Sequence, residues 1–243
     1  MNLSHILAWI FATGAAVLVR ITGQGTLAGA VAGWVVAALA ILGFGPGALL
    51  PLATFVFGSG ILTRLGHARK EAAGMAEPNR GRRGVRHVAA KLGLPALVAA
   101  AAILDRPSEA LRLAYVAALA GAFADTAGTE AGPLWRGPVV AWRGGRLARV
   151  AHGATGGISL AGLVASGIGA IAVALAGWRS GLLPSTTALA IAVGAGWIAS
   201  LTESLVGGLA FGRALGHFGR NVLVSVIATT AGWSAGALGW GRP

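Results

Sequence analysis

The sequence predicts an all-α fold: a polytopic integral membrane protein with about seven or eight transmembrane helices packed through small residues. Hydrophobic residues make up 56% of the 243-residue chain and charged residues only 11%, whereas a soluble domain usually carries about 25% charged residues. The apolar residues gather in runs close to the roughly 20 residues that cross a bilayer as helix. Forty glycines would let such helices approach closely. We treat residues 1–243 as a single membrane domain.

Eight apolar runs define the predicted spans, which cover residues 3–19, 26–44, 46–63, 92–104, 111–126, 157–178, 186–209 and 221–240. The first run lacks a basic n-region and a clear cleavage site, which favours a retained helix over a cleaved signal peptide. The second ends at the sequence Gly-Phe-Gly-Pro-Gly of residues 43–47. The fourth is short for a full crossing and needs part of its flanks. An acidic turn at residues 105–109 separates it from the fifth.

Basic residues mark one side of this predicted topology. With the N-terminus outside, 15 of the 19 Lys and Arg residues fall on the side of the predicted loops at about 64–91, 127–156 and 210–220. Positive charge retains loops in the cytoplasm, so we expect these loops to lie inside the cell. The same rule explains the net charge of +12 without a nucleic-acid partner. The chain has no cysteine, which excludes disulfides and thiolate chemistry.

Polar side chains gather at the predicted cytoplasmic ends of the spans. An ionisable residue in a membrane segment is expensive and is a functional candidate. A one-sided cluster suits an enzyme or receptor for a cytosolic ligand better than a transporter, whose binding groups usually lie near the bilayer midplane. The cluster comprises Ser59, Thr63, Lys91, Asp125, Thr126, Thr129, Glu130, Gly156, Gly157, Ser159, Ser200, Glu203, Ser204 and Asn221.

The carboxylates of this cluster suggest a metal site. Asp125, Glu130 and Glu203, with flanking hydroxyls, could bind Mg²⁺ through oxygen ligands; the alternative is that they pair with arginines of the basic loops. Asp125 and Glu130 lie about 140° apart on an ideal helix. They can therefore act together only if the helix ends at or before Gly128, where glycine favours a break.

Small residues form two further patterns near these carboxylates. The run at residues 152–159 resembles an anion cradle at a helix start, although it lacks a Walker lysine, and its plain interpretation is a flexible helix entry. Two stripes at helical spacing predict close packing between the sixth and seventh spans. They comprise Ser159, Gly162, Ser166 and Gly169, and Gly196, Ser200, Glu203 and Gly207.

Several stretches together resemble a membrane family that includes the plant chloroplast phytyl-phosphate kinase and the animal transmembrane protein 19-type proteins. The matching stretches are residues 58–66 with Lys70, 124–132, 153–162 and 196–208, and the helix start at Asn221. The chain departs from the family pattern at three positions. Glu203 stands where the family usually has Asp, and His87 and Lys91 replace a Gln and an Asn.

The resemblance to this family, whose members include many bacterial and archaeal relatives, implies an integral-membrane isoprenoid-phosphate kinase in a bacterial or archaeal cytoplasmic membrane, with its active site on the cytoplasmic side. Such an enzyme would transfer a phosphoryl group from a nucleoside triphosphate, CTP or ATP, to a prenyl or phytyl monophosphate, with Mg²⁺ as cofactor. Asp125, Glu130 and Glu203 would bind the metal and act in catalysis. The residues expected to contact substrate or phosphate are Ser59, Thr63, Lys70, Arg83, Arg86, Lys91, Thr126, Gly156, Gly157, Ser159, Ser204 and Asn221.

Two other functions stay open from the sequence. One is a transporter or flippase for a lipid phosphate or small anion. The other is a non-catalytic scaffold whose arginine loops bind anionic lipid head groups. In each case the bilayer is a partner, and an oligomer is compatible with the sequence.

Overall fold

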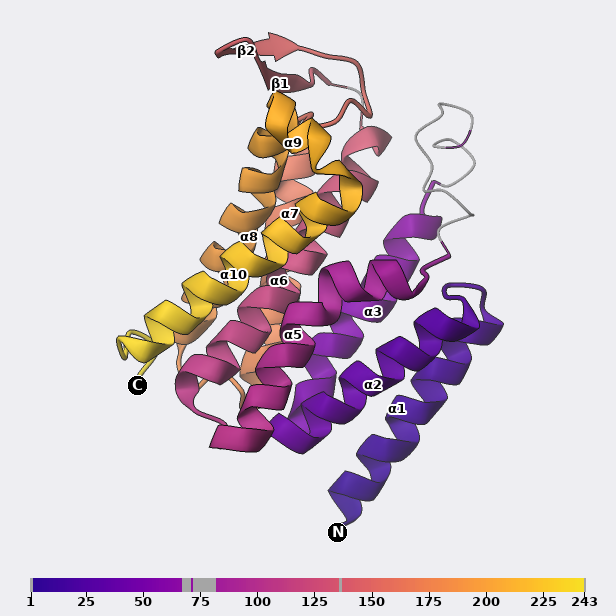
Figure 1. Cartoon of the computed structure of the whole chain (residues 1–243), viewed down its shortest axis with the longest axis vertical. Helices are drawn as coiled ribbons and strands as arrows, with labels where there is room; N and C mark the ends of the chain where they lie inside the picture. Colours follow the sequence, from indigo (N-terminus) through magenta and orange to yellow (C-terminus); the bar gives the residue numbers. More distant parts are fainter. Residues whose placement is uncertain (1, 67–70, 72–81, 136, 243) are drawn as a thin grey trace.

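The computed structural model describes residues 2–66, 71, 82–135 and 137–242. Eight long helices in this part run alternately up and down (Figure 1). Seven of the helices are long and apolar enough to cross a membrane; α10 is not among them, although it lies alongside the others. The all-α membrane fold predicted from the sequence is therefore confirmed. The long helices are α1 (Leu3–Ile21), α2 (Leu27–Phe44), α3 (Leu49–Arg64), α5 (Val85–Asp105), α6 (Glu109–Ala131), α7 (Leu160–Arg179), α8 (Thr186–Gly208) and α10 (Gly216–Ala237).

Short elements distinguish the two ends of the bundle. One end carries the turn between α1 and α2, a hairpin of strands β1 (Val140–Arg143) and β2 (Arg146–Arg149), and the short helix α9 (Ala210–Ala214). We call it the hairpin end. Both termini lie at the opposite end, where η1 (Pro46–Ala48) joins α2 to α3. A further short helix, η3 (Gly132–Leu134), follows α6 at the hairpin end.

Helix α6 forms the centre of the bundle. It contacts α3, α5, α7, α8 and α10, and 89% of its apolar 18-residue stretch is buried inside the protein. Its sequence is dominated by alanine, so its neighbours approach the backbone closely. Helices α1 and α2 form the edge of the bundle, with α2 packed on α5 and α1 packed on α2. The side chains of α6 therefore face protein on nearly every side.

Glycines set the closest approaches to α6. A Cβ atom built on Gly196 of α8 would lie 2.7 Å from the backbone nitrogen of Gly121 in α6, and one on Gly169 of α7 would lie 3.1 Å from the Phe123 carbonyl oxygen. Gly162 of α7 also faces α6. Helices α7 and α8 also contact each other, as the two stripes predict, and Trp197 of α8 donates to Ser166 Oγ of α7 at 3.1 Å. The closest approaches of the stripe glycines Gly162, Gly169 and Gly196, however, are to α6.

Three helix boundaries near the candidate site differ from the predictions. Helix α10 begins at Gly216 and not at residue 221, so α9 and the start of α10 occupy the predicted loop 210–220. The fourth span, predicted from residue 92, begins at Val85, so the last part of the predicted loop 64–91 is helical. A hydropathy criterion leaves residues 85–91 out of the span because they include the charged residues Arg86 and Lys91. The expected break at Gly128 is absent, because α6 stays helical to Ala131. Gly128 instead packs against α7, where an added Cβ would lie 3.2 Å from the Gly162 carbonyl oxygen.

The hairpin interrupts a region predicted to be a loop within residues 127–156. Its two-residue turn, Gly144-Gly145, has φ values of +56° and +82°, as a type I′ turn requires. Val140 and Ile158 exchange two backbone hydrogen bonds of 2.9 and 2.7 Å. These bonds attach the glycine-rich segment before α7 to the edge of the hairpin.

Candidate functional site

A polar cavity of about 270 Å³ lies at the hairpin end between α6, α7, α8 and α10. It is closed on one side by the turn at residues 152–159. Six of the residues predicted to form the site line it, and they come from three separate parts of the chain. These six are Asp125, Gly156, Gly157, Ser159, Glu203 and Ser204.

Asp125 enters the cavity from α6 and is paired with Lys91 of α5. The Lys91 Nζ atom lies 2.5 Å from Asp125 Oδ2. It also donates to Thr126 Oγ1 at 2.9 Å and to the Ala122 carbonyl oxygen at 3.2 Å. Lys91 is 4% exposed and Asp125 7% exposed. The three predicted residues Lys91, Asp125 and Thr126 thus form one buried group beside the cavity.

Glu203 enters the cavity from α8 and is paired with Arg220 of α10. The Arg220 Nε atom donates to Glu203 Oε1 at 2.7 Å, and its Nη1 atom donates to the Gly212 carbonyl oxygen at 3.2 Å. Arg220 also lines the cavity. Pairing of a carboxylate with an arginine at residues 210–220 was the alternative to metal binding, and for Glu203 it is present.

The structure divides the three predicted carboxylates between two places. Glu130 does not line the cavity; its Oε1 atom accepts a 2.6 Å hydrogen bond from Thr63 Oγ1 on α3. The reason is the unbroken α6 helix, which turns Glu130 away from the face that carries Asp125. Within the described residues, no group of three or more His, Asp and Glu side chains is placed to hold a metal ion. Asp125 and Glu203 are the pair that shares the cavity.

The turn at residues 152–159 is a fixed part of the cavity wall. Gly156 has φ +76°, and an added Cβ would lie 2.2 Å from the Gly208 backbone nitrogen, so only glycine fits there. The Gly157 amide donates to the Ala154 carbonyl oxygen at 2.9 Å. Gly157 therefore shapes the turn, and its amide is already engaged inside it.

Ser159 begins α7 at the rim of the cavity. Its Oγ atom caps the helix by accepting a 3.1 Å hydrogen bond from the Gly162 amide. The first turn of a helix carries a partial positive charge and attracts anions. The cavity therefore combines this helix start and Arg220 with two carboxylates.

Arginines outside the cavity hold its wall in place. Arg143 of β1 donates to the Gly208 carbonyl oxygen at the end of α8 and, at 2.7 Å, to the Thr155 carbonyl oxygen. Arg213 of α9 also donates to the Gly208 carbonyl oxygen, at 2.7 Å. Both residues thus cap the last turn of α8, where cations are favourable.

A second polar group lies between α3, α6 and the chain entering α5. Arg83 Nη2 donates to Thr63 Oγ1 at 3.1 Å, and Thr63 in turn donates to Glu130. Thr63 and Arg83 line a pocket of about 230 Å³ next to the turn between α1 and α2. Ser59, one turn before Thr63, is fully buried, and its Oγ atom has no hydrogen-bond partner among the described residues.

The remaining predicted residues lie at the edge of these two groups or outside them. The Arg86 guanidinium lies over the Phe218 ring, 5.4 Å from its centroid. Asn221 is buried and its Nδ2 atom lies 3.0 Å from the Nε2 atom of His217, which lines the cavity. Asn221 thus orients a cavity residue without lining the cavity. Lys70 lies outside the described residues.

Arg220 and His217 are cavity residues that the sequence did not identify as part of the site. In the sequence, Arg220 is one of the basic residues of the predicted loop 210–220. The feature of the sequence that indicates such a partner is Glu203 itself, because a carboxylate buried in a membrane helix needs a cation or a hydrogen-bond donor. Arg220, 17 residues later in the chain, was one of several arginines able to supply it.

Comparison with known proteins identifies the family. A family model described as integral membrane protein DUF92 matches residues 10–230. An uncharacterised membrane protein of the cyanobacterium Synechocystis sp. is 34% identical over 164 residues, which is 66% of this chain and 62% of the relative. The chain thus spans less than two thirds of that relative's length. No solved structure matches this chain. The chain belongs to the DUF92 family of integral membrane proteins.

Proposed function

We propose that this protein is a membrane kinase that converts an isoprenoid monophosphate, such as prenyl or phytyl phosphate, into the diphosphate. The donor is a nucleoside triphosphate, CTP or ATP. The observation that carries the proposal is the polar cavity at the hairpin end, where Asp125, Glu203, Arg220 and the start of α7 converge. We place this end in the cytoplasm, where nucleotides are available, because the basic residues concentrate there.

The reaction asks little of the protein in proton transfer. A terminal oxygen of the acceptor phosphate attacks the γ-phosphorus, and the bond from that phosphorus to the β,γ-bridging oxygen breaks. A phosphate monoester has a second pKa of about 6 and is an anion at neutral pH. The nucleoside diphosphate leaves with the electron pair of the broken bond, and no proton needs to be exchanged. The need is for positioning and charge compensation.

Asp125 and Glu203 suit Mg²⁺ binding in this cavity. Each ion pair uses one carboxylate oxygen, Asp125 Oδ2 or Glu203 Oε1, which leaves the second oxygen of each group for a metal. Mg²⁺ at nucleotide sites is usually bound by one or two carboxylates together with substrate phosphates and water. The donor set therefore fits, and when bound the ion would offset charge on the phosphate oxygens.

The cations around the cavity would offset the remaining phosphate charge. Arg220 offers a planar guanidinium, which is well matched to phosphate oxygens. The start of α7, capped by Ser159, adds the positive end of a helix dipole. Lys91 acts from behind Asp125 and holds that carboxylate in place. Ser204 and Thr155 line the same cavity and offer neutral polar contacts.

The test is a direct assay of purified protein in detergent or nanodiscs. CTP or ATP labelled at the γ-phosphate is supplied with Mg²⁺ and a panel of prenyl monophosphates, and labelled prenyl diphosphate is quantified. We expect product that disappears when EDTA removes the metal. We expect Asp125→Asn and Glu203→Gln each to lower the rate by about a hundredfold or more, since each removes a charged group that acts on the transferring phosphate.

A matched control separates these effects from general loss of charge. Glu109→Gln removes a carboxylate from the same helix as Asp125 but at the opposite end of the bundle, where it faces Arg242 at 3.8 Å. This variant should keep wild-type activity. Failure of the well-folded protein to make diphosphate from any pairing of donor and acceptor would overturn the kinase proposal and favour transport of a lipid phosphate.

A further inference from the structure

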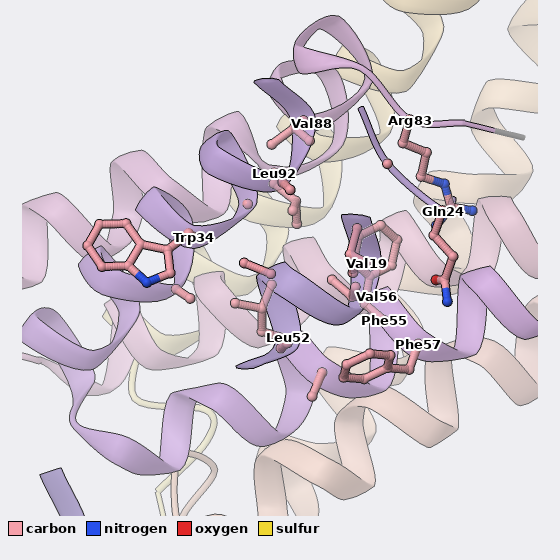
Figure 2. Close-up of a pocket in the computed structure, with 18 of the residues that line it drawn as sticks. Val19, Gln24, Trp34, Leu52, Phe55, Val56, Phe57, Arg83, Val88 and Leu92 are labelled. Carbon is pink, nitrogen blue, oxygen red and sulfur yellow. The ribbon is translucent and has the colours of Figure 1, made fainter. Parts of the chain in front are cut away.

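A narrow apolar groove lies beside the polar cavity, between α1, α2, α3 and the start of α5. Figure 2 shows its two ends: Trp34 lies at one end, and Arg83 with Gln24 lies at the other. Leu52 and Leu92 are among the aliphatic side chains between them. Most of the groove is thus lined by apolar side chains, and polar side chains line its end near the hairpin.

The groove opens towards the bilayer and has a small volume. Phe11 and Trp34 line it and are 49% and 36% exposed, so it can be entered sideways from the lipid. Its volume of about 100 Å³ corresponds to roughly eight water-sized positions at about 12 Å³ each. Such a space accommodates one hydrocarbon chain, whereas an ordinary bilayer lipid carries two.

The polar end of the groove is built for an anion. Arg83 is anchored by its backbone, which donates to the Gln24 carbonyl oxygen at 2.9 Å and accepts from the Thr26 amide at 3.1 Å. Lys91 also lines this end. Gln24 Oε1 and His87 Nε2 are buried there without a hydrogen-bond partner in the part of the chain that the structure describes. The Arg83 guanidinium and the unused ring nitrogen of His87 complement a phosphate, while the Lys91 ammonium group is already engaged by Asp125, Thr126 and the Ala122 carbonyl oxygen.

One ion pair separates the groove from the polar cavity. Lys91 lines the groove, Asp125 lines the cavity, and their charged atoms are 2.5 Å apart. A phosphate at the polar end of the groove would therefore be separated from the cavity by this ion pair. Two reactants could reach the same pair of residues by separate routes, one from the bilayer and one from water.

We propose that this groove holds the isoprenoid chain of the acceptor and that Arg83 and the Nε2 atom of His87 receive its phosphate. The inference rests on the proposed kinase function and adds the place of the lipid substrate. The acceptor enters between α1 and α2, and the nucleotide occupies the cavity on the other side of Lys91 and Asp125. A single chain with a monoester phosphate fits both the small volume and the charge of the groove.

Gly33 of α2 provides a specific test. An added Cβ at Gly33 meets no described atom within 4 Å, so a leucine there would fill the groove without moving backbone. It would take the room of about two chain methylenes, which corresponds to about a tenfold rise in KM for phytyl phosphate. The kcat and the KM for nucleotide should not change, and isopentenyl phosphate, whose chain is too short to reach Gly33, should be used as before.

Gly14 supplies the matched control. It lies on the exposed side of α1, does not line the groove, and an added Cβ there also meets no described atom within 4 Å. Gly14→Leu should therefore leave all kinetic constants unchanged. Equal KM values for phytyl phosphate in Gly33→Leu, Gly14→Leu and wild-type protein would overturn the groove assignment while leaving the kinase function intact.

A binding measurement keeps the inference testable without catalysis. Protein in nanodiscs is irradiated with phytyl monophosphate carrying a diazirine on its chain, and in parallel with a diazirine-labelled diacyl phosphatidylglycerol. We expect the phytyl probe to label groove residues such as Phe11 and Leu52, less in Gly33→Leu than in Gly14→Leu. Labelling of the groove by the diacyl probe alone, or no preference of either probe for it, would refute the proposal. If wild-type protein makes no diphosphate yet the phytyl probe labels the groove, the kinase function fails and lipid-phosphate binding stands.

Discussion

The Lys91–Asp125 pair allows a quantitative test of the site. Replacing Lys91 by Met removes the three hydrogen bonds of its ammonium group and leaves Asp125, only 7% exposed, without its counter-charge. Breaking a buried ion pair by removing one partner costs about 3–5 kcal/mol. For a chain of this size, 1 kcal/mol shifts the unfolding midpoint by about 2–4 °C. We therefore expect Lys91→Met to lower Tm by about 6–20 °C.

A double-mutant cycle isolates the pair from other effects of the substitutions. Asp125→Leu should destabilise the protein by a similar amount, because it leaves the ammonium of Lys91 buried and unpaired. The double variant, with Lys91→Met and Asp125→Leu together, should recover most of the loss, since replacing both charges with apolar groups is often close to neutral. The assay is thermal unfolding in detergent, followed by fluorescence of the tryptophans.

The size of the coupling decides whether the reasoning holds. If both charges are removed from water as the structure indicates, the sum of the single losses should exceed the loss in the double variant by several kcal/mol. Additive losses, with coupling below about 0.5 kcal/mol, are what independent sites give. Additivity would mean that water reaches both groups, and the pair would then not form a wall between groove and cavity.

Two further predictions concern the cavity and its wall. Arg220→Gln should lower kinase activity by about tenfold to a hundredfold, because a hydrogen bond to a charged group contributes about 1.5–3 kcal/mol. The control is Arg213→Gln, which removes a nearby charge outside the cavity and should have a much smaller effect. Equal losses of activity in the two variants would contradict the role given to Arg220. Gly156→Ala should lower Tm more than Gly145→Ala. Both glycines have positive φ, so both changes cost about 1 kcal/mol in backbone strain. Only at Gly156 would the new Cβ also clash with backbone, because the Gly208 nitrogen lies 2.2 Å away. Similar Tm values for the two variants in a thermal scan would refute the close contact with α8.

The fold was predictable because apolar runs determine membrane helices directly. The errors occur where side-chain chemistry depends on a neighbour that sequence does not reveal. Hydropathy excluded residues 85–91 from the fourth span because of polar residues such as Lys91, but that charge is neutralised inside the bundle by Asp125. Gly128 was expected to break α6, and instead its missing side chain gives room to Gly162. In both cases tertiary packing decided against local preference.

The hairpin was a recognisable pattern that the sequence interpretation missed. Two glycines between Trp142-Arg143 and Arg146-Leu147 are a typical type I′ signal. The overall apolar character of the chain favoured a purely helical interpretation and left this region as a loop. The hairpin matters for the site because Arg143 joins its first strand to Gly208 and Thr155.

The sequence could predict which types of residue form the candidate site, but not which side chains they contact. Asp125 and Glu203 stood out as carboxylates in apolar helices, and both line the cavity. Glu130 stood out equally, yet it faces Thr63 of α3, because five residues of uninterrupted helix separate it from the face of Asp125. Which arginine meets Glu203 depends on where α10 packs, and that is determined by the whole bundle.

The central position of α6 has a consequence for how the protein enters the membrane. Its span is the least hydropathic of the seven candidate membrane helices and carries Asp125 and Glu130 near its end. A carboxylate on a helix exposed to lipid is strongly unfavourable, so α6 is poorly suited to stay in the bilayer alone. The helix made immediately before it, α5, brings Lys91, which pairs with Asp125. Helices α5 and α6 should therefore leave the translocation machinery as a pair, with each charge carried into the membrane by the other.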